Sequence, residues 1–190
     1  MNNLSSPKLS VALLHYPVKN KNGEIITSAV TNLDLHDIAR IAKTYGIESF
    51  YVITPLNDQR ALVEKIVSHW IDGWGGTYNP KRKAALALIR IKSSIEEAVA
   101  DIKADTGTDV RVVVTCAAEK QKTLKFEDLR HRLNDPTQAY LLAFGTAWGL
   151  TDEFLDASDF ILEPVKGAAK YNHLPVRSAV AIILDRLLGR

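Results

Sequence analysis

The sequence predicts an α/β domain built on a mostly parallel sheet that is covered by helices. Short apolar runs rich in branched residues alternate along the chain with amphipathic stretches of helical spacing, and this alternation is typical of parallel sheets. A length of 190 residues suits one domain with a substantial core. No repeat, low-complexity tract or linker divides the sequence, so we expect a single domain over residues 1–190 with its core at about 9–188.

Six short apolar runs, each bounded by turn residues, predict the strands. They are residues 10–16, 49–54, 85–91, 110–116, 140–144 and 159–162. The run VRVVVTC at 110–116 is the clearest buried strand, because it is continuous and rich in valine. The run at 85–91 consists largely of alanine and leucine, so a helix is the alternative there.

Apolar residues at helical spacing predict five helices. The first begins after Thr31 or Asn32 and ends at Gly46, where a glycine is typical of a helix C-terminus. Ser94, with Glu97 three residues later, is typical of a capping box. The other four expected helices cover residues 58–71, 94–104, 126–133 and 175–188. A polar connection is expected before the first helix, at residues 17–31.

The composition excludes several classes of protein. Hydrophobic residues make up 46% and charged residues 24%, which excludes a disordered chain. The longest apolar runs have six residues, so we expect no membrane span and no signal peptide. One cysteine rules out an intramolecular disulfide, and a reducing, cytoplasmic location is therefore expected.

The charge is nearly balanced overall but unevenly placed. Lys and Arg number 24 against 22 Asp and Glu, which argues against a protein that coats nucleic acid by bulk charge. Residues 81–92 carry no acidic side chain, whereas residues 152–163 carry no basic one. Trp70, Trp74 and Tyr78 precede the basic run, so the loop expected at 73–83 is a candidate RNA-binding surface. An ordinary solvated surface is the alternative.

Signatures of several enzyme classes are absent. There is no glycine-rich loop ending in Gly-Lys-Ser or Gly-Lys-Thr, no His-Glu-x-x-His and no Gly-x-Ser-x-Gly. The lone cysteine, Cys116, has no His or Cys at the spacing of a zinc site. We therefore expect no metal site, no phosphate-loop NTPase site and no hydrolase elbow.

Three segments combine glycine or polar residues with expected strand ends or helix starts. LLAFGTAWGL, at 141–150, brings two glycines to the carboxyl end of a strand, where open α/β sheets bind ligands. FILEPVKGAAKYNHL, at 160–174, places a dense polar cluster before a helix start with its free N–H groups. The third segment, at 31–46, is a loop and a helix with carboxylates and an arginine.

These segments carry a family resemblance. FGTAWGL followed by LEPVKGAAKYNHLPVRSAVAIILDRLLG resembles the second and third signature motifs of the SPOUT (SpoU–TrmD) class of RNA methyltransferases. SAVTNLDLHDIARIAKTYGI is similar to the first motif, a loop followed by a helix that carries an arginine and ends in a glycine. The resemblance covers about residues 9–188 and points to a small, single-domain branch of that class.

The resemblance implies a deep trefoil knot in the C-terminal third and a homodimer with its active site at the subunit interface. It implies an enzyme that transfers a methyl group from S-adenosylmethionine (SAM) to tRNA or rRNA, with S-adenosylhomocysteine as the product and no membrane or metal involved. Cys116 is expected beside the cofactor as a small buried residue rather than as a nucleophile. The residues expected to bind the cofactor are Thr115, Cys116, Gly145, Thr146, Gly149, Ile161, Leu162, Glu163, Pro164, Gly167, Tyr171, Asn172, His173 and Leu174.

The resemblance also implies catalytic side chains. In relatives that methylate ribose, an arginine at the position of Arg40 is thought to help activate the 2′-hydroxyl; a helix-surface salt bridge is the alternative for Arg40. In relatives that methylate guanine N1 an aspartate takes the proton, which makes Asp34 and Asp37 candidates. His173 is a further candidate base, or forms a structural hydrogen bond to the neighbouring subunit. The residues expected to contact RNA are Arg40, Tyr78, Lys81, Arg82 and Lys83.

Two departures from the family pattern concern the acceptor atom. Thr146-Ala147 stands where ribose methylators usually have Asn-Glu, and Tyr171-Asn172-His173 stands where they usually have Ser-Leu-Asn. A base nitrogen and a ribose 2′-hydroxyl therefore both stay open as acceptors. Two other functions are also open: a catalytically inactive knotted module that binds cofactor or RNA, and a flavodoxin-like enzyme, which the strand–helix alternation alone would permit.

Overall fold

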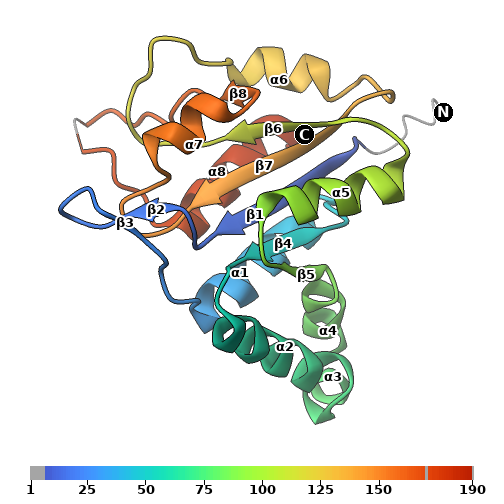
Figure 1. The fold of residues 1–190 in the computed structure, drawn as a ribbon. Coiled ribbons are helices and arrows are strands. Elements are labelled where there is room, and N and C mark those ends of the chain that lie inside the picture. Colours follow the sequence, from blue (N-terminus) through green and yellow to red (C-terminus); the bar gives the residue numbers. More distant parts are fainter. Residues whose placement is uncertain (1–6, 170, 190) are drawn as a thin grey trace.

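The computed structural model describes residues 7–169 and 171–189 of the chain. Its central layer is a six-stranded parallel sheet with the strand order β5-β4-β1-β7-β6-β8 (Figure 1). The strands are β1 (Leu9–Leu14), β4 (Phe50–Ile53), β5 (Ile89–Lys92), β6 (Val110–Val114), β7 (Ala139–Gly145) and β8 (Phe160–Ile161). The predicted mostly parallel α/β sheet is confirmed.

Helices cover both faces of this sheet (Figure 1). One face packs against α5 (Ile95–Thr106) and α7 (Asp152–Ala157). The other face packs against α1 (Asn32–Thr44), α2 (Asn57–Ile71), α4 (Pro80–Leu86), α6 (Phe126–Arg132) and α8 (Val176–Leu188). Within the described residues, no helix is both long enough and apolar enough to cross a membrane.

Strand β1 lies in the middle of the sheet, and all six of its residues are buried. Val11 and Leu13 belong to the apolar cluster on one face, and Ala12 and Leu14 to the cluster on the other, because successive side chains in a strand alternate. Burial on both faces explains why the sequence here is a continuous apolar run rather than an alternating one.

Local sequence determines the helix ends. Thr31 begins α1, because its Oγ1 accepts a hydrogen bond from Asp34 N at 3.3 Å. Ser94 begins α5 in the same way, accepting from Glu97 N at 3.4 Å. The expected capping box is not closed on Ser94, since the Glu97 carboxylate accepts from Ser93 N at 2.8 Å instead. The cap of α5 therefore involves both serines.

Residues 73–83, expected as a loop, are mostly helical. They form α3 (Trp74–Tyr78) and the first half of α4. Asn79 begins α4, because its side chain accepts a hydrogen bond from Arg82 N at 3.0 Å. Pro80 fits the first helical turn, where a backbone N–H has no partner within the helix. The surface considered for RNA is therefore a pair of short helices.

Five strands are shorter than predicted, β5 and β6 among them, and the expectation that β6 is the clearest buried strand is wrong. Strand β5 begins at Ile89 rather than at residue 85, because Ala85 and Leu86 belong to the end of α4. In β6 only Val113 and Val114 are buried. The short strand β8 pairs with these two residues, which leaves the beginning of β6 with less cover.

Besides α3, three elements were not predicted. β2 (Val18–Lys19) and β3 (Ile25–Ile26) form an antiparallel hairpin inside the connection expected at 17–31, and α7 follows β7. Strands of two residues are too short to produce a periodic pattern. The hairpin lies beside the loop after β7, since Lys19 N donates to Gly149 O at 2.9 Å.

Candidate functional site

The loops after β1, β6 and β7 meet the start of α8 around a cavity of about 880 Å³, which we call the carboxyl-edge cavity. Its volume lies in the usual range of small-molecule sites, and it lies where parallel α/β sheets bind ligands. The predicted site residues that line it are Asp34, Thr115, Cys116, Gly145, Thr146, Gly149, Asn172, His173 and Leu174.

Other predicted cofactor residues lie outside this lining. They are Ile161, Leu162, Glu163, Pro164, Gly167 and Tyr171. The carboxylate of Glu163 accepts a hydrogen bond from Phe126 N at 2.7 Å and so satisfies the first turn of α6. Lys170, in the same polar segment, is outside the described residues. The structure thus brings the two ends of the predicted cofactor loops together. Of residues 161–167, only Val165 lines the cavity, and the predicted residues of that range lie behind it.

A tight turn after β7 shapes one wall of the cavity. A Cβ on Gly145 would lie 2.8 Å from both Cγ and N of Leu150, so that only glycine fits there. Gly149 has a φ of +94°, and its N–H donates to Thr146 O at 2.9 Å. The two glycines therefore let residues 145–149 form a tight turn, and this turn makes one wall of the cavity.

A chain of hydrogen bonds joins the buried His15 to the cavity wall. His15 Nδ1 lies 3.0 Å from Ser28 Oγ, which lies 2.5 Å from Thr146 Oγ1. Thr146 Oγ1 in turn donates to Leu14 O at 3.0 Å. Ser28 and Thr146 both line the cavity. Sequence reasoning missed Ser28 and gave His15 no role, because a single histidine at a strand end has no pattern around it.

The donor of each of these three hydrogen bonds is determined, because Leu14 O can only accept. Thr146 gives its hydrogen to Leu14 O, Ser28 gives its hydrogen to Thr146, and His15 Nδ1–H donates to Ser28. Burial lowers the pKa of His15 to about 4, so the ring is neutral at pH 7, as this tautomer requires. Ser28 and Thr146 can therefore only accept hydrogen bonds from a ligand.

Asp34, predicted as catalytic, is 6% exposed and has both carboxylate oxygens bonded. Thr31 Oγ1 donates to its Oδ2 at 2.6 Å, and Arg177 Nη1 donates to its Oδ1 at 2.9 Å. Arg177 Nε also lies 3.3 Å from Asp37 Oδ2. Arg177 thus joins the start of α8 to α1. The sequence did not reveal it, because 143 residues separate it from Asp34.

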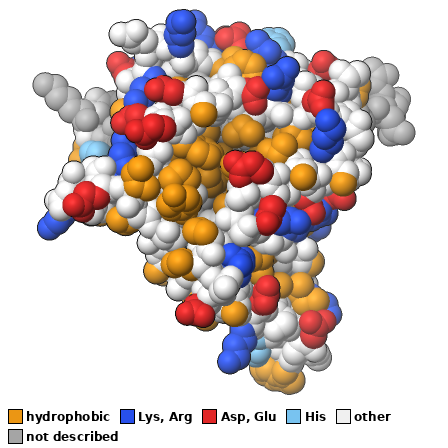
Figure 2. Space-filling model, in the orientation of Figure 1, with side chains coloured by type: hydrophobic (Ala, Val, Ile, Leu, Met, Phe, Trp, Pro, Cys, Tyr) orange, Lys and Arg blue, Asp and Glu red, His pale blue; other side chains and the backbone are white. Residues whose placement is uncertain are grey.

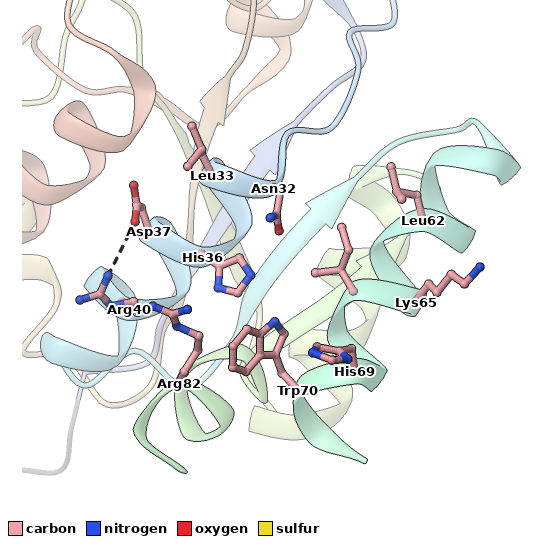
Figure 3. A pocket seen from close by; sticks show the side chains of 11 residues that line it. Asn32, Leu33, His36, Asp37, Arg40, Leu62, Lys65, His69, Trp70 and Arg82 are labelled. Atoms are coloured by element: carbon pink, nitrogen blue, oxygen red, sulfur yellow. Dashed lines mark ion pairs between the residues drawn. The ribbon is translucent and has the colours of Figure 1, made fainter. Parts of the chain in front are cut away.

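Asp37 and Arg40 line a different cavity, of about 550 Å³, between α1, α2 and α4 (Figure 3). We call it the α1–α2 cavity. Arg40 Nη1 lies 3.9 Å from Asp37 Oδ1, and its side chain is 59% exposed. The predicted catalytic residues of α1 are therefore divided, since Asp34 lines the carboxyl-edge cavity and the other two line the α1–α2 cavity.

The predicted RNA-contacting residues outside α1 lie on α3 and α4. Tyr78 stacks on Trp74 with ring centroids 5.2 Å apart, and both rings are more than 70% exposed at the tip formed by α3 (Figure 2). Lys81 and Lys83 are exposed. Arg82 is half-buried, and its guanidinium lies 5.0 Å from the centroid of the Trp70 ring.

The basic stretch at residues 81–92 is free of acidic partners only in its first part. Arg90 and Lys92 pair with Asp101 of α5 at 2.7 and 2.6 Å. Although burial raises the pKa of Asp101, hydrogen bonds from Lys92, Arg90 and Tyr51 lower it to about 2. The expectation of one basic face across 81–92 is therefore corrected, because α5 neutralises its second half.

The acidic stretch at residues 152–163 is also partly neutralised. Asp152 pairs with Lys19 at 3.2 Å and with Lys120 at 2.8 Å, and these three side chains line the carboxyl-edge cavity. Cys116 lies in the same wall, and burial raises the pKa of its thiol. The thiol is therefore protonated at neutral pH and is a poor nucleophile.

Comparison with known proteins identifies the family. A family model described as SAM-dependent RNA methyltransferase matches residues 8–189. The chain belongs to this family. It is 45% identical over 181 residues to a tRNA (guanine-N(1)-)-methyltransferase of Oleidesulfovibrio alaskensis, and the match covers 95% of this chain and 42% of that protein. It is 39% identical over 180 residues to an uncharacterized protein of Aquifex aeolicus, and the match covers 95% of this chain and 88% of that protein.

Solved methyltransferases share the fold of this SAM-dependent family member. The SpoU methyltransferase AviRb of Streptomyces viridochromogenes, in complex with AdoMet, is similar at a TM-score of 0.57 and 19% identity, over 96% of this chain and 57% of that chain. A probable methyltransferase of Bordetella pertussis is similar at a TM-score of 0.64 and 13% identity, over 95% of this chain and 94% of that chain. The chain therefore belongs to a family of SAM-dependent RNA methyltransferases and shares the fold of a SpoU methyltransferase.

The carboxyl-edge cavity suits SAM, the cofactor of the family. Phe144, Leu155 and Ile183 give it an apolar wall for a nucleoside ring. Ser28 and Thr146 are acceptors, which suits the hydroxyl and ammonium hydrogens that such a ligand carries. In the described part of the chain, no group of three or more His, Cys, Asp or Glu could hold a metal ion.

Proposed function

We propose that the chain transfers the methyl group of SAM to a nucleotide of tRNA, with the cofactor in the carboxyl-edge cavity. That cavity is the observation that carries the proposal, because the loops after β6 and β7 and the start of α8 surround it. A tRNA substrate also fits the cytoplasmic location expected from a single cysteine.

The choice of tRNA rests on two relatives, 45% and 43% identical, that are described as tRNA (guanine-N(1)-)-methyltransferases. The chain spans only 42% of the length of each. More than half of each relative therefore lies outside the match, and we do not extend their guanine-N1 specificity to this chain. The proposal names the RNA and leaves both acceptor types to the experiment.

SAM supplies an electrophilic methyl group on a sulfonium and becomes S-adenosylhomocysteine. The protein has to align the acceptor atom and remove its proton where it carries one. We assign proton removal to His173, which lines the cavity from an exposed position before α8. Asp34 lines the same cavity, but its bonds to Thr31 and Arg177 suit it to holding α1 against α8.

Three groups of residues form the proposed cofactor site. Residues 145–149 make one wall, Thr115 and Cys116 make a second, and residues 172–174 make the third. Asn172 Nδ2 donates to Ala117 O at 2.8 Å and so links the second wall to the third. Val165 also lines the cavity, and its neighbours in residues 161–167 support the second wall from behind in this proposal.

We also propose the trefoil knot of the SPOUT class for this chain. Residues 161–163 run beside Leu124, and Asn172 bonds to Ala117, which supports it. Leu124 N donates to Ile161 O at 2.7 Å, and Glu163 N donates to Leu124 O at 2.9 Å. The polar segment before α8 would thus be threaded past the loop that follows β6.

The homodimer is proposed on the exposure of large apolar side chains near the carboxyl-edge cavity. Trp148 is 67% exposed, Tyr171 is 75% exposed and Leu174 is 42% exposed. A second copy would remove these surfaces from water, which favours association. Sedimentation equilibrium is expected to give twice the mass of the chain, and a monomer that is active at the same concentration would contradict the dimer.

The test of the function is methyl transfer to RNA from a strain that lacks the gene. Purified tRNA and rRNA are incubated separately with the protein and methyl-labelled SAM, and the labelled nucleoside is identified by mass spectrometry. We expect label in one nucleoside of tRNA. Label in rRNA alone would contradict the substrate, and SAM binding without transfer to either RNA would contradict catalysis.

The role of His173 is tested in the same assay. His173→Asn is expected to lower the rate of transfer about 100-fold, the usual contribution of a general base, and to leave SAM affinity within a few-fold. His131→Asn, which alters an exposed histidine of α6, is the matched control. A His173→Asn protein as fast as the control would remove His173 from the mechanism.

A further inference from the structure

The α1–α2 cavity lies outside the proposed cofactor site and has two chemically different sides. Its apolar side chains are Leu33, Leu62 and Ile66, and its nitrogen-bearing side chains include His36, His69, Trp70, Arg40 and Arg82. Figure 3 shows these side chains reaching the cavity from α1, α2 and α4. Such a division suits a ligand with one apolar part and one anionic part.

Two buried nitrogen atoms in this cavity have no hydrogen-bond partner among the described residues. They are His36 Nδ1 and Arg82 Nε. A buried polar atom without a partner destabilises a fold, so a ligand that bonded to both would be stabilised by groups already in place. The Arg82 Nε–H can only donate, which calls for an acceptor such as a phosphate oxygen.

The positive charge in the cavity exceeds the negative charge. Arg40 from α1 and Arg82 from α4 both line the cavity, and Figure 3 shows both side chains at its lower end. Asp37 supplies the one carboxylate of the described lining, and Arg177 from α8 shares it at 3.3 Å. Two guanidinium groups held close together are a common arrangement for binding an oxyanion.

The Trp70 ring holds this arrangement in place. The Arg82 guanidinium lies 5.0 Å from its centroid. The rings of His36 and His69 meet it edge-on at centroid distances of 5.4 Å each. The cationic and imidazole groups are therefore positioned before any ligand arrives, which lowers the entropy lost on binding.

We propose that the α1–α2 cavity binds one nucleotide of the substrate RNA, with its phosphate at Arg82, Arg40 and His36 and its base against the apolar side chains. This inference rests on the proposed function, because it takes the ligand to be the RNA that is methylated. It adds a second contact site, next to the cofactor cavity, on the other side of helix α1.

Two features favour RNA over a free nucleotide as the ligand. The two cavities share α1, since Asp34 lines one and Asp37 lines the other, so an extended ligand such as RNA can reach both, whereas a free nucleotide is too short. The stacked, exposed rings of Trp74 and Tyr78 lie on α3, immediately before α4, and can extend the contact to neighbouring bases.

The proposal predicts that binding takes up a proton. Burial and the charges of Arg82 and Arg40 lower the pKa of His36, while Asp37 opposes them. His69 and Lys65 face the same cavity from α2. A phosphate beside His36 would raise its pKa again, so RNA is expected to bind several-fold more tightly at pH 6 than at pH 8.

The first test measures binding of purified tRNA by fluorescence anisotropy. Arg82→Gln is expected to lower the affinity about tenfold and to reduce the salt slope of log K by about 0.7, the value for one phosphate contact on a single strand. Arg132→Gln, on α6 and in neither cavity, is the matched control and should change neither value. Equal binding by Arg82→Gln and wild type would overturn the proposal.

A second variant tests the proposal even if Arg82→Gln folds poorly. His36→Asn is expected to abolish the difference in RNA affinity between pH 6 and pH 8, whereas His69→Asn keeps it. A pH dependence unchanged in His36→Asn would overturn the proposal. So would AMP that competes as well as RNA does at equal concentration, because it would indicate a free nucleotide.

The two proposals can fail separately. Calorimetry of SAM binding is expected to give the wild-type affinity for Arg82→Gln and His36→Asn, since neither residue lines the carboxyl-edge cavity. Loss of RNA binding in these variants, with no methyl transfer by the wild type, would contradict the proposed reaction but keep the RNA site. If methyl transfer at limiting RNA were unaffected in both variants, the RNA site would be contradicted and the proposed reaction would be kept.

Discussion

His15 keeps two hydroxyl groups of the carboxyl-edge cavity in one arrangement by donating its Nδ1–H to Ser28, and its burial favours the neutral ring. Burial lowers the pKa of His15 from 6.5 to about 4, whereas in the unfolded chain the ring titrates near pH 6.5. Protonation therefore favours the unfolded chain. The stability that comes from the neutral ring is complete above pH 6.5 and is lost as the pH falls towards 4.

We expect His15→Asn to remove this pH dependence, because an asparagine Nδ2 can donate to Ser28 and does not titrate. Between pH 7.5 and pH 4.5 the wild type should lose roughly 2–3 kcal/mol more unfolding free energy than the variant. Urea denaturation at the two pH values measures the difference. Equal losses in the two proteins would show that His15 is not the group responsible.

At the scale of elements, Arg177 connects α8 to α1. It bonds to Asp34, which is 6% exposed, and approaches Asp37 at 3.3 Å. Arg177→Met is expected to lower the unfolding free energy by about 2 kcal/mol, because it leaves the Asp34 carboxylate buried with Thr31 as its remaining partner.

The double variant Arg177→Met/Asp34→Asn tests this explanation. It removes the uncompensated charge and should recover part of the lost stability, as measured by urea denaturation. A double variant less stable than Arg177→Met alone would mean that the charge of Asp34 is not the cause.

The turn between β7 and α7 offers a test of the cofactor site. Gly145→Ala places a methyl group 2.8 Å from Leu150, which has to shift the turn that forms one cavity wall. We expect SAM affinity to fall at least about tenfold, because a cofactor wall misplaced by a methyl group loses its close contacts. Calorimetry measures the affinity.

Gly167→Ala is the matched control for this prediction. A Cβ on Gly167 has no heavy atom within 4 Å among those described, and the residue does not line the cavity. SAM affinity in this variant should equal that of the wild type. If both alanine variants bound SAM equally, the walls of the cofactor site would have to be assigned differently.

The elements that the sequence predicted well are those determined by nearby residues. Helix α1 has Thr31 at its start and Gly46 after its end, and β1 is apolar at every position except Ser10 because it is buried on both faces. Helix α3 and the first half of α4 were predicted as a loop, since α3 has only five residues and packs against α2 rather than following a pattern of its own. The end of α4 was predicted as the start of a strand.

The residues of the candidate site also fall into those that the sequence indicated and those that it did not. The glycines after β7 and the polar residues before α8 were found from the sequence through a family resemblance, and Gly145 and His173 both line the cavity. Arg177 and Ser28 were missed, because their partners Asp34 and Thr146 are 143 and 118 residues away. Contacts of this range depend on tertiary packing and leave no local signal.

Across the whole molecule, the position of a charged residue says more about RNA binding than the net charge of +2 does. Figure 2 shows basic and acidic side chains mixed over one face rather than separated. Lys92 is bound to Asp101 at 2.6 Å, while Lys81 is exposed and forms no ion pair with the described residues. Of these two lysines, only Lys81 is available to a phosphate.

We therefore expect Lys81→Gln to weaken RNA binding and to reduce the salt slope of log K by about 0.7. Lys92→Gln changes the net charge equally and should leave both values unchanged. Anisotropy titrations of tRNA at several salt concentrations provide the comparison. Equal effects of the two substitutions would mean that net charge, and not its placement, governs the affinity.

The position of β1 in the sheet has a consequence for how the chain is made. β1 ends at Leu14, but β7, which pairs with one of its edges, begins at Ala139. A ribosome has to deliver all the residues between them before the centre of the sheet can form. Until then a buried apolar strand has an open edge that can pair with other chains. Newly made chains are therefore expected to depend on chaperones until β7 has emerged.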